Sequence, residues 1–316
     1  MNPATQRIIA MGETVMDILF RKEPGKGSLQ PFSATPGGSS FNSIISVGRA
    51  GIPCAFIGYA GNDRIGHQTQ DFLSQNNVQT DWFRLYDGMK SSLALAFLDS
   101  NGDAEYNFYK DIPHLQYNWP LPDFTPSDTL LFGSYYAICN GMRQQVETVV
   151  QNASQAGATI YYDINFRRTH INDLETLLPV IQWNMQHSSI VRGSADDFDI
   201  MFGTRNAEQI YYKHILPYCT NFIFTAGAGQ ITVFTNGRRM DFTAQAIPAY
   251  RIISTVGAGD NFNAGFLCEL TRSGDSNDNL SHLTQSQWSN LVQTAIHFAS
   301  AVCQSTSNNI PVGFRY

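Results

Sequence analysis

The chain of 316 residues has few basic side chains, and they form no run. Lys and Arg together number 20 against 26 Asp and Glu, which gives a formal net charge of −6. Nucleic acids and anionic membranes are bound through clustered Lys and Arg, so neither is expected as a partner. Apolar runs of the ~20 residues that a membrane span requires are also lacking. These absences favour small molecules as partners.

Paired cysteines are lacking as well. The five cysteines lie far apart, are odd in number and include no C-x-x-C pair. Neither a disulfide framework nor a zinc knuckle is therefore expected, and the seven histidines show no metal-ligand spacing. The apolar run at residues 8–11 is too short for the core of a signal peptide. A reducing compartment, the cytoplasm, is predicted.

Short apolar runs bounded by Gly, Pro, Asn or Asp alternate with segments of helical period, which is typical of a mostly parallel sheet flanked by helices. The predicted strands of this sheet are residues 8–11, 55–59, 129–132, 159–164, 189–191 and 221–225. The predicted helices are residues 40–50, 65–74, 142–156, 174–185, 207–216, 261–270 and 287–304. The pattern predicts one doubly wound α/β domain over residues 1–316.

Two further regions alternate apolar with polar residues. Four short segments predict a small sheet that stands off the core; they are residues 14–20, 31–35, 91–98 and 104–109. This sheet would come from two inserted segments, about residues 14–36 and 88–112. Residues 231–235 and 238–242 flank Asn236 and Gly237, which predicts a hairpin that extends the edge of the main sheet.

The segment around Asp260 has the composition of a phosphate site. Gly257, Ala258 and Gly259 follow a predicted strand that ends at Ile253 and precede a helix predicted to begin near Asp260. Backbone amides at a helix N-terminus bind anions, and small residues allow a phosphoryl group to approach. The Asp260 carboxylate could accept the proton of an attacking hydroxyl. Aspartate is also a favoured helix cap, so the residues alone leave that structural role open.

Two other nucleotide-binding motifs are excluded by their spacing. A P-loop requires GxxxxGK[ST], and no glycine-rich segment of this chain continues into Lys and then Ser or Thr. A dinucleotide fingerprint requires a third glycine where the chain has Phe262 or Thr232. The glycine-rich segments therefore predict neither site.

Residues 254–267, STVGAGDNFNAGFL, resemble the signature D-T-x-G-A-G-D-x-F-x-x-G of the ribokinase-like (PfkB) carbohydrate kinases. The resemblance implies that Asp260 is the catalytic base, that the amides of residues 257–259 bind the transferring phosphoryl group, and that ATP and Mg²⁺ take part. Ser254 stands where the family commonly has an aspartate linked to cation organisation. Whether a monovalent cation is required is therefore left open.

Two N-terminal segments resemble the sugar-binding motifs of this family. Residues 12–17, GETVMD, resemble G-E-x-x-x-D, and residues 37–42, GGSSFN, resemble G-G-A-x-x-N with Ser39 in place of Ala. The residues that the resemblance assigns to sugar hydroxyls are Asp17, Gly37, Gly38 and Asn42. The residues alone, without the resemblance, would predict that Asp17 is a surface acid and that residues 37–42 form a turn with a serine cap.

Residues 163–167, DINFR, resemble the D-x-N-x-R element of the fructokinase and 2-keto-3-deoxygluconate kinase branches. The resemblance implies that Asn165 contacts substrate hydroxyls and that Arg167 faces the substrate or the phosphates. An ion pair between Asp163 and Arg167 that closes the strand is the alternative.

The nucleotide side has two matching segments. Residues 194–197, SADD, resemble N-x-x-E with both ends substituted, which implies that Ser194 contacts the nucleotide and that Asp197 holds Mg²⁺, largely through water. A helix cap followed by first-turn acids would give the same letters. Residues 225–227, TAG, resemble T-x-G, which implies that Thr225 and Gly227, together with Gly259, contact the nucleotide.

The resemblance covers nearly the whole chain in the family's order. It implies transfer of the ATP γ-phosphoryl group to a primary hydroxyl of a keto sugar, with fructose as the first choice, beneath a lid that excludes water. Alternatives are 2-keto-3-deoxygluconate, ribose and nucleosides, and a non-catalytic sugar or nucleotide sensor on the same fold. Relatives often pair through their lids, so the resemblance also suggests a homodimer.

Overall fold

The computed structural model describes residues 6–22, 29–98, 104–111, 121–227, 229–245 and 247–316. Its centre is a ten-stranded sheet. The strands are β1 (Ile8–Met11), β4 (Cys54–Gly61), β5 (Val78–Gln79), β6 (Phe83–Tyr86), β9 (Thr129–Gly133), β10 (Thr159–Asp163), β11 (Ile190–Ser194), β12 (Asn221–Ala226), β13 (Gln230–Thr235) and β14 (Arg238–Thr243).

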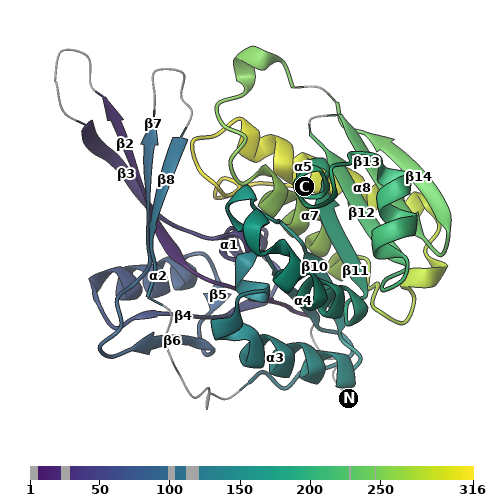
Figure 1. The fold of residues 1–316 in the computed structure, drawn as a ribbon, viewed down its shortest axis with the longest axis horizontal. Helices are drawn as coiled ribbons and strands as arrows, with labels where there is room; N and C mark the ends of the chain where they lie inside the picture. Colours follow the sequence, from purple (N-terminus) through teal and green to yellow (C-terminus); the bar gives the residue numbers. More distant parts are fainter. Residues whose placement is uncertain (1–5, 23–28, 99–103, 112–120, 228, 246) are drawn as a thin grey trace.

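The sheet order is β14-β13-β12-β11-β10-β9-β1-β4-β5, with β6 paired to β4 (Figure 1). The strands from β12 to β5 pair in parallel, whereas β12, β13 and β14 pair antiparallel. Asn236 and Gly237 link β13 to β14 with φ angles of +48° and +76°, as a tight hairpin turn requires. The predicted edge hairpin therefore forms.

Helices cover both faces of this sheet, as Figure 1 shows. They are α1 (Ser39–Arg49), α2 (Arg64–Gln75), α3 (Arg143–Gln155), α4 (Leu174–Gln186), α5 (Ala195–Phe202), α6 (Ala207–Ile210), α7 (Ala258–Arg272) and α8 (Gln285–Cys303). Side chains of α3, α4, α5 and α6 share one buried cluster, and those of α1, α2, α7 and α8 share another. The predicted helix–sheet–helix layering is confirmed.

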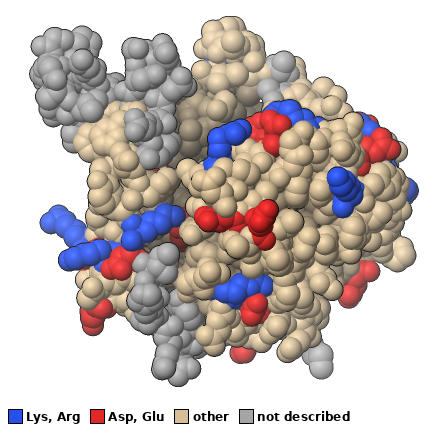
Figure 2. All heavy atoms as spheres, viewed as in Figure 1, with Lys and Arg blue, Asp and Glu red and all other residues tan. Residues whose placement is uncertain are grey.

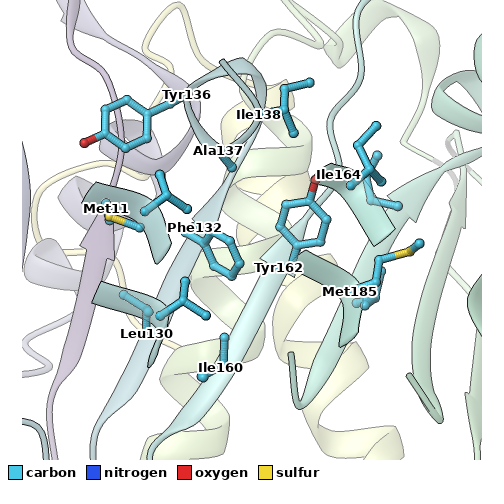
Figure 3. Packing of buried hydrophobic residues seen from close by; sticks show 14 of the residues in the cluster. Met11, Leu130, Phe132, Tyr136, Ala137, Ile138, Ile160, Tyr162, Ile164 and Met185 are labelled. Carbon is cyan, nitrogen blue, oxygen red and sulfur yellow. The ribbon is translucent and has the colours of Figure 1, made fainter. Parts of the chain in front are cut away.

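Strand β1 is buried on both faces, which explains its unbroken apolar sequence. Ile9 and Met11 belong to one cluster, while Ile8 and Ala10 belong to the other. Figure 3 shows Met11 beside Phe132 of β9, with further apolar side chains of β9 and β10 packed around them. The core thus fixes the central strands, whose carboxyl ends carry the candidate site.

A second, four-stranded sheet stands apart from the core at the left of Figure 1. Its order is β3-β2-β7-β8, from β2 (Val15–Lys22), β3 (Leu29–Gly37), β7 (Leu93–Leu98) and β8 (Ala104–Tyr109). Strand β2 follows β1 after residues 12–14, where the chain passes from the main sheet into the small sheet, and Asp17 is the third residue of β2. The ring of Phe108 is half exposed, at 54%.

The strand predicted to end at Ile253, before α7, is wrong. Residues up to Ile253 form a 3₁₀ turn, Ala249–Arg251, and extended chain instead of a strand. The amides of Ile253 and Ser254 both donate to the Cys303 carbonyl at the end of α8, and Ile253 is 59% exposed. Helix α7 begins at Ala258, two residues before the predicted start. The apolar residues of this segment lie in an exposed loop, because the segment pairs with no strand of the described sheets.

Charged groups are sparse on the face drawn in Figure 2, most of which is formed by other residues, with a few basic groups gathered at its left side. In the described part of the chain, no helix is both long and apolar enough to cross a membrane.

Candidate active site

The predicted site segments meet at the carboxyl ends of the parallel strands, where ligands bind in open α/β sheets. Asp163 ends β10 and residues 164–167 follow it, Ser194 ends β11, and Thr225 lies near the end of β12. The N-terminus of α7 packs against the same edge, because Gly259 lies beside the Arg192 side chain of β11. Segments up to 96 positions apart therefore form one site.

The glycine-rich segment forms the first turn of α7. Gly257 is the N-cap residue, with a φ of +80°, and a Cβ there would lie 2.9 Å from the Asn308 carbonyl oxygen. Ala258, Gly259 and Asp260 follow as the first three helical residues. First-turn amides have no carbonyl partner within their own helix, although the Ala258 amide donates to the Thr255 carbonyl here. The amides of Gly259 and Asp260 are thereby placed to bind an anion.

Asp260 does not cap its own helix, so the structural alternative is wrong for this residue. Its carboxylate accepts hydrogen bonds from two side chains of α1, the Ser39 hydroxyl at 2.7 Å and the Asn42 amide at 2.9 Å. The Ser43 hydroxyl donates to the Asp260 carbonyl at 2.8 Å. Helix α1 therefore fixes the direction in which the carboxylate points.

Two carboxyl groups of the site titrate abnormally. Burial raises the pKa of Asp260, the hydrogen bonds from Asn42 and Ser39 lower it, and the Arg167 charge lowers it slightly. Burial raises the pKa of Asp17 to about 7, with further contributions from the negative charges of Asp260 and Glu13. Ionising both carboxyl groups is costly, because they are buried and repel each other. Hydrogen-bond donors of a bound ligand would stabilise the ionised forms.

Asp17 and Asn42 face each other across Gly37. A Cβ on Gly37 would overlap the Asp17 carboxylate and would lie 3.9 Å from the Asn42 side-chain oxygen. That oxygen is buried and has no hydrogen-bond partner among the described residues. A Cβ on Gly38, whose φ is +127°, would collide with the Glu13 carbonyl. The predicted sugar-site residues are thus brought together and leave an acceptor that a hydroxyl can satisfy.

The D-x-N-x-R element is arranged differently from its alternative reading. Asp163 forms its ion pair with Arg192 of β11, at 3.0 Å. The predicted alternative, an ion pair between Asp163 and Arg167, is therefore wrong. Asn165 is buried and holds a φ of +40°, a costly conformation that clusters at functional sites. Arg167 is exposed, and its charge reaches Asp260.

A cavity of about 440 Å³ adjoins the N-terminus of α7. That volume suits a nucleotide-sized ligand. The predicted nucleotide residues line it, namely Ser194, Thr225, Gly227 and Gly259. Gly227 has a φ of +61°, which places a turn without side-chain bulk at the cavity wall.

Ser194 and Asp197 form a capping box at the start of α5. The Ser194 hydroxyl accepts from the Asp197 amide, and an Asp197 carboxylate oxygen accepts from the Ser194 amide at 2.6 Å. Asp197 is only 4% exposed, whereas Asp196 lines the cavity. In the described ranges, no cluster of three His, Cys, Asp or Glu residues forms a ready metal site.

The sequence alone did not indicate Arg192 or Asp196. Both line the cavity, and Arg192 is buried at 7% exposure within β11. A charged residue inside an otherwise apolar strand is costly unless it is paired, and this was the available signal.

An open parallel α/β sheet that carries a helix N-terminus, a nucleotide-sized cavity and an enclosed carboxylate at one edge is the architecture of a small-molecule phosphotransferase. The chain belongs to the pfkB family of carbohydrate kinases, because the model of this family matches residues 5–313. The predicted family and enzyme class are thereby confirmed.

Two curated relatives illustrate the range of the family. The fructokinase of Rhizobium leguminosarum bv. trifolii is 29% identical over 294 residues, which cover 92% of this chain and 85% of the relative. The aminoimidazole riboside kinase of Salmonella typhimurium is 25% identical over 272 residues, which cover 85% of this chain and 82% of the relative.

Solved structures share the fold over almost the entire chain. A fructokinase from Vibrio cholerae in a form with fructose, ADP and potassium ion bound has a TM-score of 0.81 at 19% identity, covering 96% of this chain and 94% of that one. Aminoimidazole riboside kinase from Salmonella enterica has a TM-score of 0.76 at 20% identity, covering 95% and 94%. The ribokinase-like fold is confirmed.

Proposed function

We propose that this carbohydrate kinase transfers the γ-phosphoryl group of ATP to a primary hydroxyl of a keto sugar, with fructose converted to fructose 6-phosphate. In this proposal Asp260 accepts the hydroxyl proton, and the α7 amides stabilise charge on the transferring phosphoryl group. Phosphoryl transfer requires mainly positioning and electrostatic stabilisation, which a rigid helix N-terminus supplies.

One observation carries the proposal: the Asp260 carboxylate is held by Ser39 and Asn42 at the N-terminus of α7, beside the cavity. The raised pKa of Asp260, caused chiefly by burial, increases its basicity relative to an exposed aspartate. Asp17 and the unpartnered oxygen of Asn42 offer acceptors for further hydroxyls. A polyhydroxylated substrate satisfies these groups.

Fructose is favoured by the relatives. The Rhizobium leguminosarum protein is a fructokinase, and the Vibrio cholerae structure contains fructose and ADP. A nucleoside is the second candidate, because the Salmonella enterica enzyme was solved with aminoimidazole riboside and an ATP analogue. In either case Asn165 is proposed to contact substrate hydroxyls, and Arg167 to face the substrate or the phosphates.

The residues at the cavity fit a nucleotide and a divalent cation. Thr225 and Gly227 would contact the phosphates or ribose of ATP, and Ser194 offers a hydroxyl beside them. Mg²⁺ prefers carboxylate and water oxygens, and when bound it would offset the negative charge of the phosphates. Asp196 offers a carboxylate at the cavity; Asp197 remains the predicted partner through water, with one oxygen committed to the capping box.

Three further expectations remain predictions. The small sheet would close over the sugar as a lid and exclude water, as one part of a single kinase domain. A homodimer would form through that lid, on which Phe108 and Tyr109 are exposed. The cytoplasmic location is predicted from the sequence alone. Whether the enzyme requires a monovalent cation stays open, because Ser254 stands where the family commonly has an aspartate linked to cation organisation.

A coupled assay of ADP release tests the substrate. Fructose, 2-keto-3-deoxygluconate, ribose, adenosine and aminoimidazole riboside would each be supplied with ATP and Mg²⁺. We expect the highest kcat/KM with fructose. A higher kcat/KM with a nucleoside would overturn the fructose assignment and leave the kinase class intact.

The same assay separates the kinase from a non-catalytic sensor. A sensor would bind sugar or nucleotide in calorimetry and release no ADP with any member of the panel. Sugar-dependent ADP release that disappears in Asp260→Asn would exclude the sensor.

A further inference from the structure

A buried polar network connects three neighbouring strands to α7. Arg192 of β11 donates to Asp163 of β10 at 3.0 Å and to the Thr225 hydroxyl of β12 at 2.8 Å. Asn263 of α7 donates to the second Asp163 oxygen at 2.8 Å, and the Tyr161 hydroxyl donates to Asn263 at 3.0 Å. The guanidinium is therefore fixed in position by elements of the sheet and of α7.

The end of this guanidinium lies directly behind the phosphate-site amides. A Cβ built on Gly259 would be 3.2 Å and 3.4 Å from the two terminal nitrogens of Arg192. A side chain at position 259 would press against the cation, whereas glycine lets the backbone of the first turn lie this close to it without displacing the guanidinium. Arg192 also lines the cavity, together with Ala258 and Gly259.

The hydrogen-bonding capacity of Arg192 is not exhausted. Its Nε is buried and has no partner in the described part of the chain, and each terminal nitrogen carries a second hydrogen. Guanidinium groups bind phosphate oxygens in fixed, forked geometries and stay charged when buried. Asp163 lies on one side of the fork, which leaves the side toward Gly259 and the cavity for a ligand.

We propose that Arg192 is a further phosphate-binding residue of this kinase: a buried cation behind the first turn of α7 that attracts the terminal phosphates of the nucleotide. Asp163 and Asn263 act as positioning residues, because Asp163 holds the guanidinium, Asn263 holds Asp163, and neither is among the residues that line the cavity. The proposal rests on the proposed function, since it assumes that the nucleotide phosphates lie at the α7 amides.

A purely structural ion pair is the competing explanation. Such a pair would stabilise the contact between β10 and β11 and would have no preference among nucleotides. A phosphate-binding cation, in contrast, distinguishes ADP from AMP, because AMP ends two phosphorus atoms short of the transferring group. The two explanations therefore differ in the predicted ratio of ADP affinity to AMP affinity, and the stability of the variants does not distinguish them.

The test is calorimetric titration of ADP and AMP, with Mg²⁺ and without sugar, into the wild type, Arg192→Met and Arg192→Met/Asp163→Asn. Hydrogen bonds to charged groups correspond to ~10-fold to ~100-fold in affinity. We expect ADP affinity to fall by about that factor in both variants, with AMP affinity within threefold of the wild type. ADP affinity within threefold of the wild type in either folded variant would overturn the proposal.

The double variant guards against misfolding, because Arg192→Met alone leaves Asp163 charged and unpaired, whereas the double variant has neither charge. If the double variant recovers ADP binding, the pair is structural and the proposal fails. Arg7→Met is the matched control: Arg7 forms a comparable pair with Asp128, 2.9 Å, at the opposite end of the strands. It should leave both affinities unchanged.

Binding is measured without sugar, so the result does not depend on which sugar is phosphorylated. If fructose is not a substrate but Arg192→Met loses ADP affinity, only the substrate assignment falls. If fructose is phosphorylated and ADP affinity is unaffected, only the role of Arg192 falls.

Discussion

The Ser39 hydroxyl donates a 2.7 Å hydrogen bond to the Asp260 carboxylate, although 221 positions separate the two residues. The family motif that residues 37–42 resemble commonly has alanine at this position. The serine therefore donates a hydrogen bond to the proposed base, which an alanine at this position could not do. Together with Asn42 it opposes the effect of burial on the pKa of Asp260.

Ser39→Ala should change the pH dependence of the reaction. The hydrogen bond lowers the pKa of Asp260, so its loss raises that pKa, and the ionised base appears only at higher pH. We expect the acid limb of the kcat profile to move to higher pH, with kcat on that limb reduced ~3-fold to ~10-fold.

Ser43→Ala is the control for this change, because the Ser43 hydroxyl donates to the Asp260 main-chain carbonyl and not to its carboxylate. The prediction is wrong if the two variants shift the acid limb equally.

Asp260→Asn should abolish most of the activity while leaving the fold intact. The amide can accept a hydrogen bond but cannot take the hydroxyl proton, and a positioned base contributes ~10²-fold to ~10⁴-fold in rate. kcat should fall by that factor, with ADP affinity preserved. Asp71→Asn, on the exposed side of α2, should behave as the wild type. A loss below about tenfold would remove Asp260 from the role of base.

Asp17 should make stability depend on pH. Its folded-state pKa of about 7 exceeds the value of ~3.9 in an unfolded chain, so the native state favours the protonated form. The stabilisation is fully present below about pH 4 and is lost as pH rises through 7. Asp17→Asn, which cannot ionise, should therefore be more stable than the wild type at pH 8 by about 2–4 kcal/mol.

Urea unfolding of both proteins at pH 4.5 and pH 8 measures this difference. The stability gain of Asp17→Asn should be much smaller at the lower pH. A gain that is the same at both pH values would show that Asp17 titrates normally.

Gly257→Ala should lose both stability and activity. Gly257 and Gly51 have nearly the same φ, +80° and +81°. A Cβ at 257 would lie 2.9 Å from the Asn308 carbonyl oxygen, whereas a Cβ at 51 would have no atom of the described residues within 4 Å. Each alanine should cost about 1–2 kcal/mol through the left-handed backbone. Gly257→Ala should cost more and should weaken ADP binding, because α7 must shift.

Thermal unfolding and ADP titration of the two alanine variants separate backbone strain from the local contact. Equal destabilisation and unchanged ADP affinity in both would refute the role of the Asn308 contact.

The layers of the fold could be predicted because central strands are buried on both faces and their apolar runs are local signals. Strand β1 and the β13–β14 hairpin are examples. The exposed loop before α7 was misread, because Ile252 and Ile253 are apolar without being covered. Burial depends on what packs against a segment, and the residues of the segment itself do not reveal this.

The site was predictable where a motif carries its own geometry, as at residues 257–260. Pairings across the sheet were not. Asp163 takes Arg192 as its partner and Asp260 takes Ser39, over separations of 29 and 221 positions. Such contacts are created by the order of the strands, which the residues around each carboxylate do not reveal.

The packing of α1 on α7 has a consequence for synthesis on the ribosome. Phe41, Ile44 and Ile45 of α1 share a buried cluster with α7 and α8, so the part of α1 that packs on these two helices stays uncovered until the last fifth of the chain emerges. At ~5–20 residues per second, the 221 positions between Ser39 and Asp260 take roughly 10–40 s. During that interval the nascent chain presents an apolar helix face to chaperones, and a truncated product would lack the proposed base as well as its cover.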